Sequence, residues 1–299
     1  MALSKSFIPH LSLVLCNVVW ACDFPLYSLV LGHYVSPLAM VAASLVVASL
    51  LSFVPLIWEK PESVEPSDRM KIFAAAMLIG VVRKLCLMYG LVKTSPIDGA
   101  IISTTTPLLV LIFSAILGGE HITRQKAVGL LLGMGGAIAI VLFGESHTHA
   151  QSTMLGNLII LLGSCVSAIY MVCFKSLVAK YRISTLLRWI YTISAILMFP
   201  LGAHDIVTTN FKAMQGVVVW AVLFVLIVPT YLPNLLLNYS LRFVAPTITS
   251  IYAYIQPIVA TILAVAMGLD RIHLDTIIFA VIIFVGVGLV ISAYGAKKG

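Results

Sequence analysis

Hydrophobic residues are grouped along this chain into ten long runs, separated by short polar connections. Each run is roughly 18 to 26 residues long, which lets a helix with a rise of about 1.5 Å per residue cross about 30 Å of hydrocarbon. The pattern therefore predicts ten membrane-spanning helices. Their ranges are 7–32, 37–58, 70–93, 97–118, 126–143, 154–178, 184–201, 214–241, 246–268 and 274–294.

The composition supports this prediction. Of 299 residues, 61% are apolar and 10% are charged, and the mean hydropathy is +1.10. Soluble globular domains are about 45–50% apolar and about 25% charged, so a soluble fold is excluded. The first run is longer than the apolar region of a signal peptide and no small-residue cleavage site follows it, which indicates a membrane anchor.

The net charge of +7 is explained by the membrane and not by a nucleic-acid partner. With the amino terminus in the cytoplasm, eleven lysines and arginines fall in inward loops and tails and three fall in outward loops. The positive-inside rule then predicts that both termini are cytoplasmic, in a cell membrane such as the bacterial inner membrane. Four cations remain inside predicted spans, namely Arg83, Lys84, Lys175 and Arg188.

The two halves of the chain are related in sequence. A gapless shift of 150 residues aligns similar residues across two predicted helices and their loop. The pairs include Tyr89 and Tyr239, Pro96 and Pro246, Pro107 and Pro257, Glu120 and Asp270, and Gly136 and Gly286. The halves, 1–145 and 151–299, each contain five predicted spans, an odd number, so they must cross the bilayer in opposite directions. Inverted repeats of this kind are typical of secondary transporters.

Residues 89–141 carry a tyrosine, a helix of small residues with an internal proline, a Gly-x-Glu turn and a glycine-rich final helix. This pattern resembles the EamA repeat of the drug/metabolite transporter superfamily. Residues 238–291 are similar but have Asp270 in place of the usual glutamate. The resemblance implies an all-α membrane protein with ten helices in two inverted five-helix repeats. Members export amino acids and other metabolites, or move sugars, phosphorylated sugars and organic cations.

The segment VVWACDFPLYSLV, at 18–30, resembles the first helix of the family, in which the pattern W-G-x-N-F is common. Here Ala21, Cys22 and Asp23 replace the glycine, the variable residue and the asparagine. The departure matters because it puts a carboxylate in a helix that lines the cavity in relatives.

Asp23, Arg83 and Lys84 lie at similar depth in their predicted spans. A charge near the bilayer centre costs at least about 2.5 kcal/mol, so it is normally paired or faces a wet cavity. Asp23 therefore either forms a structural ion pair or belongs to a substrate or proton site. Arg83 and Lys84 point about 100° apart and cannot both face one partner. Two cations beside one carboxylate favour a substrate with a carboxylate or phosphate, which arginine binds bidentately.

Further polar residues are candidates for the substrate pocket. Tyr231, Asn234 and Asn238 form a stripe on one helical face and either line a cavity or join helices by hydrogen bonds. Trp20 either stacks on an apolar part of the substrate or packs against lipid and protein. The remaining pocket candidates are Tyr89, Thr106, Tyr252 and Gln256.

Three prolines are candidate hinges. Pro107 and Pro257 deprive the carbonyls of Ser103 and Ala253 of their helical partners, so each residue marks either a hinge or a packing kink. Pro25, beside Asp23, is open to the same two interpretations.

Other features indicate structure more than chemistry. Gly129, Gly133 and Gly136 suit close helix packing or a homodimer seam. His147 and His149, near Glu145, lack the further ligands that a metal needs, and a solvated turn is the favoured interpretation. Lys175 and Arg188 lie close enough to span ends to extend toward the interface. No phosphate-binding loop or catalytic triad is found, so no enzyme, ATP coupling or cofactor is predicted.

The sequence therefore predicts a secondary transporter, an exporter of small metabolites such as amino acids, working by alternating access near the bilayer midplane. Proton coupling through Asp23 is part of this hypothesis. The alternatives are a sugar-phosphate or organic-cation carrier and, in another class, a non-transporting scaffold whose charges only hold helices together.

Overall fold

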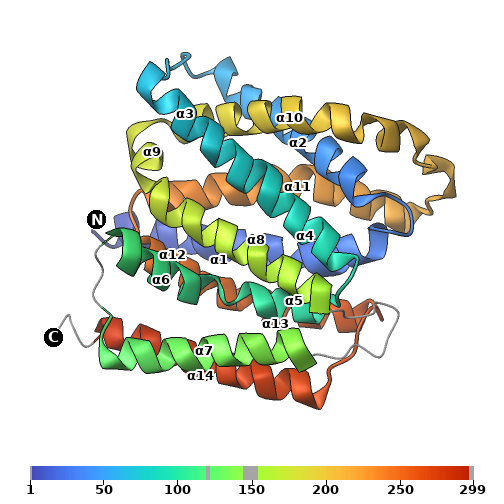
Figure 1. Cartoon of the computed structure of the whole chain (residues 1–299). Helices are drawn as coiled ribbons and strands as arrows, with labels where there is room; N and C mark the ends of the chain where they lie inside the picture. Colours follow the sequence, from blue (N-terminus) through green and yellow to red (C-terminus); the bar gives the residue numbers. More distant parts are fainter. Residues whose placement is uncertain (1, 119–121, 144–153, 296–299) are drawn as a thin grey trace.

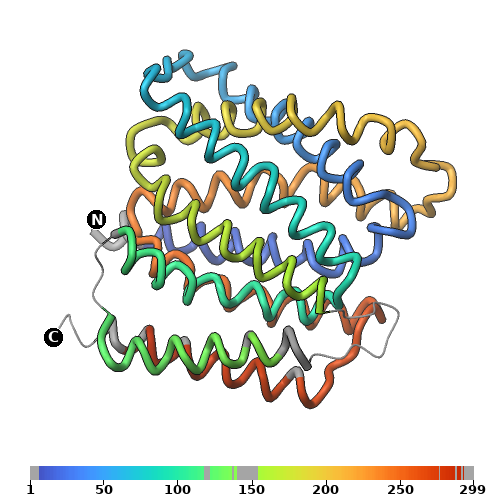
Figure 2. The backbone as a smooth tube through the Cα atoms, viewed as in Figure 1, coloured from blue at the N-terminus to red at the C-terminus, as the bar shows by residue number. Residues whose placement is uncertain are grey.

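The computed structural model describes residues 2–118, 122–143 and 154–295, and the regular elements within these ranges are helices (Figures 1 and 2). They are α1 (Ala2–Val30), α2 (Pro37–Phe53), η1 (Val54–Ile57), α3 (Pro66–Ala75), η2 (Ala76–Val82), α4 (Arg83–Leu91), α5 (Pro96–Ser103), α6 (Thr106–Gly118), α7 (Arg124–Phe143), α8 (Met154–Cys173), α9 (Lys175–Lys180), α10 (Ile183–Thr208), η3 (Phe211–Ala213), α11 (Gly216–Leu241), α12 (Pro246–Ile251), η4 (Tyr252–Tyr254), α13 (Ile255–Ala266) and α14 (Leu274–Gly295).

Eight helical segments in the described ranges are long and apolar enough to cross a membrane. They consist of α1, α2 with η1, α3 to α4, α5 with α6, α8, α10, α11, and α12 to α13. The chain is therefore an integral, multi-pass membrane protein. The other two predicted spans, 126–143 and 274–294, coincide with the helices α7 and α14. That these two also cross the membrane stays a prediction.

Helices from the two halves pack against each other in a symmetric pattern. The pair α1 and α11 has the counterpart α8 and α4, and the pair α5 and α13 has the counterpart α12 and α6. The pairs α2 with α10 and α7 with α14 join equivalent helices, and they lie at opposite edges of the molecule in Figure 1. The start of α1 and the end of α14 lie at the same end of the bundle, at the left in Figure 1.

Two of the three candidate hinges coincide with interruptions of a helix. The α-helix stops at Ser103 and resumes at Thr106, next to Pro107, and the turn η4 separates α12 from α13 just before Pro257. The Ser103 carbonyl, which Pro107 deprives of its helical donor, accepts a hydrogen bond from the Thr106 hydroxyl at 2.7 Å. Pro25 lies inside the continuous helix α1. Hinge motion at these residues stays a prediction.

Close packing at glycines joins α7 to α14, as the small-residue spacing predicts. A Cβ atom on Gly129 would lie 2.4 Å from the carbonyl oxygen of Gly286. A Cβ atom on Gly136 would lie 3.0 Å from the carbonyl oxygen of Phe279. The two backbones therefore touch where side chains are absent. These glycines make contacts between two helices of the same chain, and a homodimer stays a prediction.

Candidate functional site

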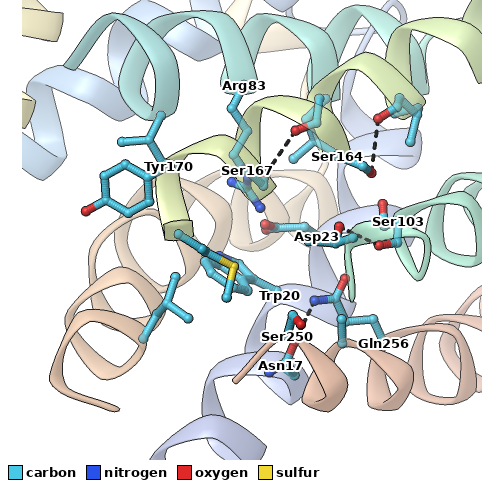
Figure 3. A pocket seen from close by; sticks show the side chains of 18 of the residues that line it. Asn17, Trp20, Asp23, Arg83, Ser103, Ser164, Ser167, Tyr170, Ser250 and Gln256 are labelled. Carbon is cyan, nitrogen blue, oxygen red and sulfur yellow. Dashed lines mark hydrogen bonds between the residues drawn. The ribbon is translucent and has the colours of Figure 1, made fainter. Parts of the chain in front are cut away.

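A cavity of about 80 Å³ lies among helices of both halves, where α1, α4, α5, α6 and α8 approach η4 and α11 to α13 (Figure 3). Its wall is rich in polar side chains for a site enclosed by apolar helices. The polar, charged and hydroxyl-bearing residues of the wall, with Trp20, are Asn17, Trp20, Asp23, Arg83, Ser103, Thr106, Ser164, Ser167, Tyr170, Thr249, Ser250 and Gln256. Ligand pockets are typically cavities in which a few polar groups converge among apolar side chains, so this cavity is the candidate binding site.

Asp23 is the acidic member of the cavity wall. Its side chain is buried, and its Oδ1 atom has no hydrogen-bond partner among the residues that the structure describes. Among the described residues, no lysine or arginine lies within the 4.0 Å of an ion pair with Asp23. The structural ion pair that was one interpretation of Asp23 is therefore not formed in this structure. A buried carboxylate that keeps an open acceptor in a cavity can bind a cationic group or a proton.

Arg83 is the basic member of the wall and is held by two neighbours. Its Nε donates a hydrogen bond to the Ser167 hydroxyl at 2.8 Å, and its guanidinium lies 5.0 Å from the centre of the Trp20 ring (Figure 3). In the described part of the chain, the terminal Nη groups make no hydrogen bond. Because both donate in one plane, they can bind a carboxylate bidentately.

Lys84 points away from the cavity, as expected of the neighbour of Arg83 on a helix. Its ammonium donates to the Ser44 hydroxyl at 2.9 Å and lies 3.4 Å from the Thr230 hydroxyl. The cavity wall therefore presents one carboxylate and one guanidinium. The surplus of positive charge that the three side chains suggested is not present on the wall itself.

The stripe on α11 makes hydrogen bonds and does not line the cavity. Asn234 donates to the carbonyl of Thr230 at 3.0 Å, and Asn238 donates to that of Asn234 at 2.7 Å. Asn238 also accepts from Tyr170, which does line the cavity, at 2.8 Å. The Tyr231 hydroxyl is buried and has no hydrogen-bond partner in the described ranges, and the Tyr231 ring lies 6.1 Å from that of Tyr191.

The remaining candidates divide between the wall and its surroundings. Trp20, Thr106 and Gln256 line the cavity, and Gln256 donates to the side chain of Asn17 at 2.7 Å. Tyr89 is 39% exposed at the surface, and Tyr252 is hydrogen-bonded to His10 at 2.6 Å; neither is part of the wall.

Several cavity residues were missed from the sequence, namely Asn17, Ser164, Ser167, Tyr170, Thr249 and Ser250. The signal for three of them was present, because Ser164, Ser167 and Tyr170 are three residues apart and share one face of α8. The same spacing drew attention to Tyr231, Asn234 and Asn238 on α11, and these three residues lie outside the wall.

The residues Glu120, Glu145, His147 and His149 lie outside the described part of the chain. Within that part, no group of three or more histidine, cysteine, aspartate or glutamate side chains is close enough to hold a metal ion. Arg188 lies 5.9 Å from the ring of Phe53, away from the cavity.

A charged cluster joins the halves at the end of the bundle where α1 begins (Figure 1). Asp68 accepts hydrogen bonds from Lys180 at 2.7 Å, Lys71 at 2.9 Å and the Tyr181 hydroxyl at 2.8 Å. Lys180 also donates to Glu65. The hydrogen bonds from Lys180 to Asp68 and then to Glu65 raise the pKa of Lys180 above its ordinary value.

Known proteins share both sequence and fold with this chain. The model of the EamA-like transporter family matches residues 8–142 and 154–292. The uncharacterized transporter YyaM of Bacillus subtilis (strain 168) is 24% identical over 276 residues, which cover 91% of this chain and 89% of the relative. An uncharacterized transporter of Archaeoglobus fulgidus is 22% identical over 285 residues, covering 94% and 96%. A protein of known crystal structure has the same fold, with a TM-score of 0.63, 16% identity and 96% of each chain covered.

Proposed function

The chain belongs to the EamA-like transporter family and is a membrane transporter, and from this premise we propose that it exports small metabolites such as amino acids across the cytoplasmic membrane. In this proposal the cavity is the substrate site, and access to it alternates between the two sides of the membrane.

The pairing of an open carboxylate with an open guanidinium in one cavity is the observation that supports the substrate class. An α-amino acid carries an ammonium and a carboxylate on the same carbon atom. The ammonium can bind the Oδ1 atom of Asp23, and the carboxylate can bind the Nη groups of Arg83. Hydroxyl groups of the wall complete the hydrogen bonds. Because the two wall charges are opposite, a dipolar solute enters without leaving an uncompensated charge.

The proposed transport cycle uses ten membrane crossings in two inverted halves, with both termini in the cytoplasm of the cell and the inner membrane as the location. It is supported by the symmetric pairing of helices between the halves and by the common end at which α1 begins and α14 ends. Exchange of the conformations of two such halves opens the cavity to one side and then to the other.

Binding and flux of the purified protein test this function. A thermal-shift screen with neutral amino acids, phosphorylated sugars and amines is expected to give stabilisation by amino acids, followed by their exchange in proteoliposomes. Arg83→Ala is expected to abolish both signals. Arg188→Ala, which removes an arginine outside the cavity, is the matched control and is expected to retain them. Unchanged binding and exchange in Arg83→Ala would show that the cavity is not the amino-acid site.

A further inference from the structure

One π-helical turn, η2, immediately precedes the two adjacent cations of α4. At its end the backbone N–H of Arg83 donates to the carbonyl of Leu78, five residues earlier, where a regular helix would use the residue four earlier. A π-turn accommodates one residue more than an α-turn, and such turns inside α-helices are frequent at functional sites. The turn therefore changes the direction of the side chains of α4 relative to those of α3.

The π-turn fits closely against α10 at Ser194. This serine is fully buried, and its hydroxyl lies within hydrogen-bond distance of two carbonyl oxygens, that of Ile190 in its own helix at 2.8 Å and that of Ala76 in η2 at 3.1 Å. A Cβ atom on Gly80 would lie 2.0 Å from the Ser194 hydroxyl, so the glycine backbone packs directly against the serine. A regular turn would bring Ile79 to roughly this position, because successive residues differ by about 100°. Its branched side chain has no room there, so the contact favours the π-turn.

The extra residue determines which side chain faces the cavity. A regular turn would rotate α4 by about 100° relative to α3. Val82 would then take the direction that Arg83 has now. Arg83 would take that of Lys84, toward Ser44 and Thr230. The cavity would lose its guanidinium, although the amino-acid sequence of the helix would be unchanged.

We infer that Ser194 and Gly80 are positioning residues that hold η2 as a π-turn and thereby direct Arg83 into the cavity, in place of Val82 or Lys84. The inference rests on the proposed function, in which Arg83 binds the substrate carboxylate. The second half contains no counterpart of this turn, because residues 226–232, 150 positions later, lie inside α11. The cation is thus presented by one half alone.

Cysteine labelling tests the direction of the side chains without any measurement of transport. In a background from which the five native cysteines are removed, Val82→Cys, Arg83→Cys and Lys84→Cys are exposed to a small cationic thiol reagent. We expect the Arg83→Cys variant to react at least about tenfold faster than the other two, since only this position faces the cavity. Equal rates, or no reaction at Arg83→Cys, would contradict the inference.

Ser194→Gly tests the fit at the π-turn. It removes the Oγ and Cβ atoms that lie 2.0 and 2.8 Å from a Cβ atom built on Gly80, and with them the side chain that leaves no room for Ile79 at this position. In this variant, the fast reaction is expected to move from Arg83→Cys to Val82→Cys. A labelling pattern that stays the same in Ser194→Gly would show that the contact does not set the direction of Arg83.

Deletion of Leu78 provides a second test if Ser194→Gly fails to fold. Removing one residue converts the π-turn to an α-turn and leaves α4 in the same direction, so Arg83→Cys should remain the fast-reacting position. If the turn does not absorb the deletion, the fast reaction moves to Lys84→Cys and the inference fails. Deletion of Val228, its counterpart in the continuous α-helix α11, is the matched control and is expected to abolish folding.

The two proposals fail in different ways. If the labelling follows the expected pattern but the wild-type protein neither binds nor exchanges amino acids, the substrate assignment is wrong and the positioning role stands. If amino acids are transported but the labelling does not change with Ser194→Gly and the deletion of Leu78 shifts the fast reaction to Lys84→Cys, the positioning role is wrong and the function stands.

Discussion

The carboxylate of Asp68 lies 2.7 Å from the ammonium group of Lys180, and this contact joins the first half of the chain to the second at the end where α1 begins (Figure 1). Asp68 is almost fully buried, whereas Lys180 is partly exposed. The contact links α3 to α9, so a transport cycle of the proposed kind that separates the halves at this end would have to break it.

Lys180→Met is therefore expected to lower the melting temperature by about 2 °C, the small effect of a partly exposed ion pair in a chain of this size. Lys71→Met, which removes the more exposed lysine on the same carboxylate, should have a smaller effect. Since the pKa of Lys180 is raised in the folded protein, its contribution is present at neutral pH and is lost as the pH rises through that raised value. Thermal melts of both variants at neutral and strongly alkaline pH would check this, and a larger effect at alkaline pH would disprove it.

Asp23→Asn is expected to weaken the binding of amino acids by about 10- to 100-fold, because a charge-assisted hydrogen bond to the substrate ammonium is lost. If Asp23 also carries a coupling proton, the variant should exchange substrate without responding to a pH gradient. Calorimetry and proteoliposome flux measure the two effects separately. Asp275→Asn, in the first turn of α14, is the control. Equal amino-acid binding and flux in the two variants would show that Asp23 does not bind the substrate.

Ser167→Ala is expected to weaken amino-acid binding by about fivefold, because Arg83 loses the acceptor that orients its guanidinium. Ser164→Ala is a matched control, since Ser164 lines the same cavity but donates to the carbonyl of Ile160 in its own helix at 3.3 Å. Titrations with an amino acid and with the corresponding amine distinguish the effects. In Ser167→Ala, the affinity should fall only for the amino acid, which carries the carboxylate. A fall in affinity for both the amino acid and the amine would indicate general damage to the cavity.

Gly286→Ala is expected to destabilise the protein by about 1 to 3 kcal/mol, the usual effect of overpacking. A Cβ atom there would lie 2.4 Å from the backbone nitrogen of Gly133 and 2.6 Å from the carbonyl oxygen of Gly129. Gly288→Ala is the control two residues away, since a Cβ atom on Gly288 has no neighbour within 4 Å. Denaturation in detergent should show a lower free energy of unfolding for Gly286→Ala and little change for Gly288→Ala.

Much of the fold could be predicted because its determinants are local. The length of an apolar run sets whether a helix can cross the hydrocarbon, and a proline removes a specific backbone donor wherever it occurs. The interruptions before Pro107 and Pro257 followed from this chemistry. The cavity was predicted less completely. Ser167 orients Arg83 from another helix, 84 positions away in the sequence, and no local pattern relates two residues across such a distance.

The sequence by itself determined the membrane-embedded helical class, the relation between the halves and the family, since these depend on composition, on apolar length and on residues matched at a constant offset. It also brought Asp23, Arg83 and Lys84 to notice. Only the tertiary structure decided which cation faces the cavity. That choice depends on one extra residue in a helical turn, which is stabilised where the backbone of Gly80 packs against Ser194 of another helix. A constant helical period applied to the sequence cannot show such an extra residue, because the contact that stabilises it comes from another helix.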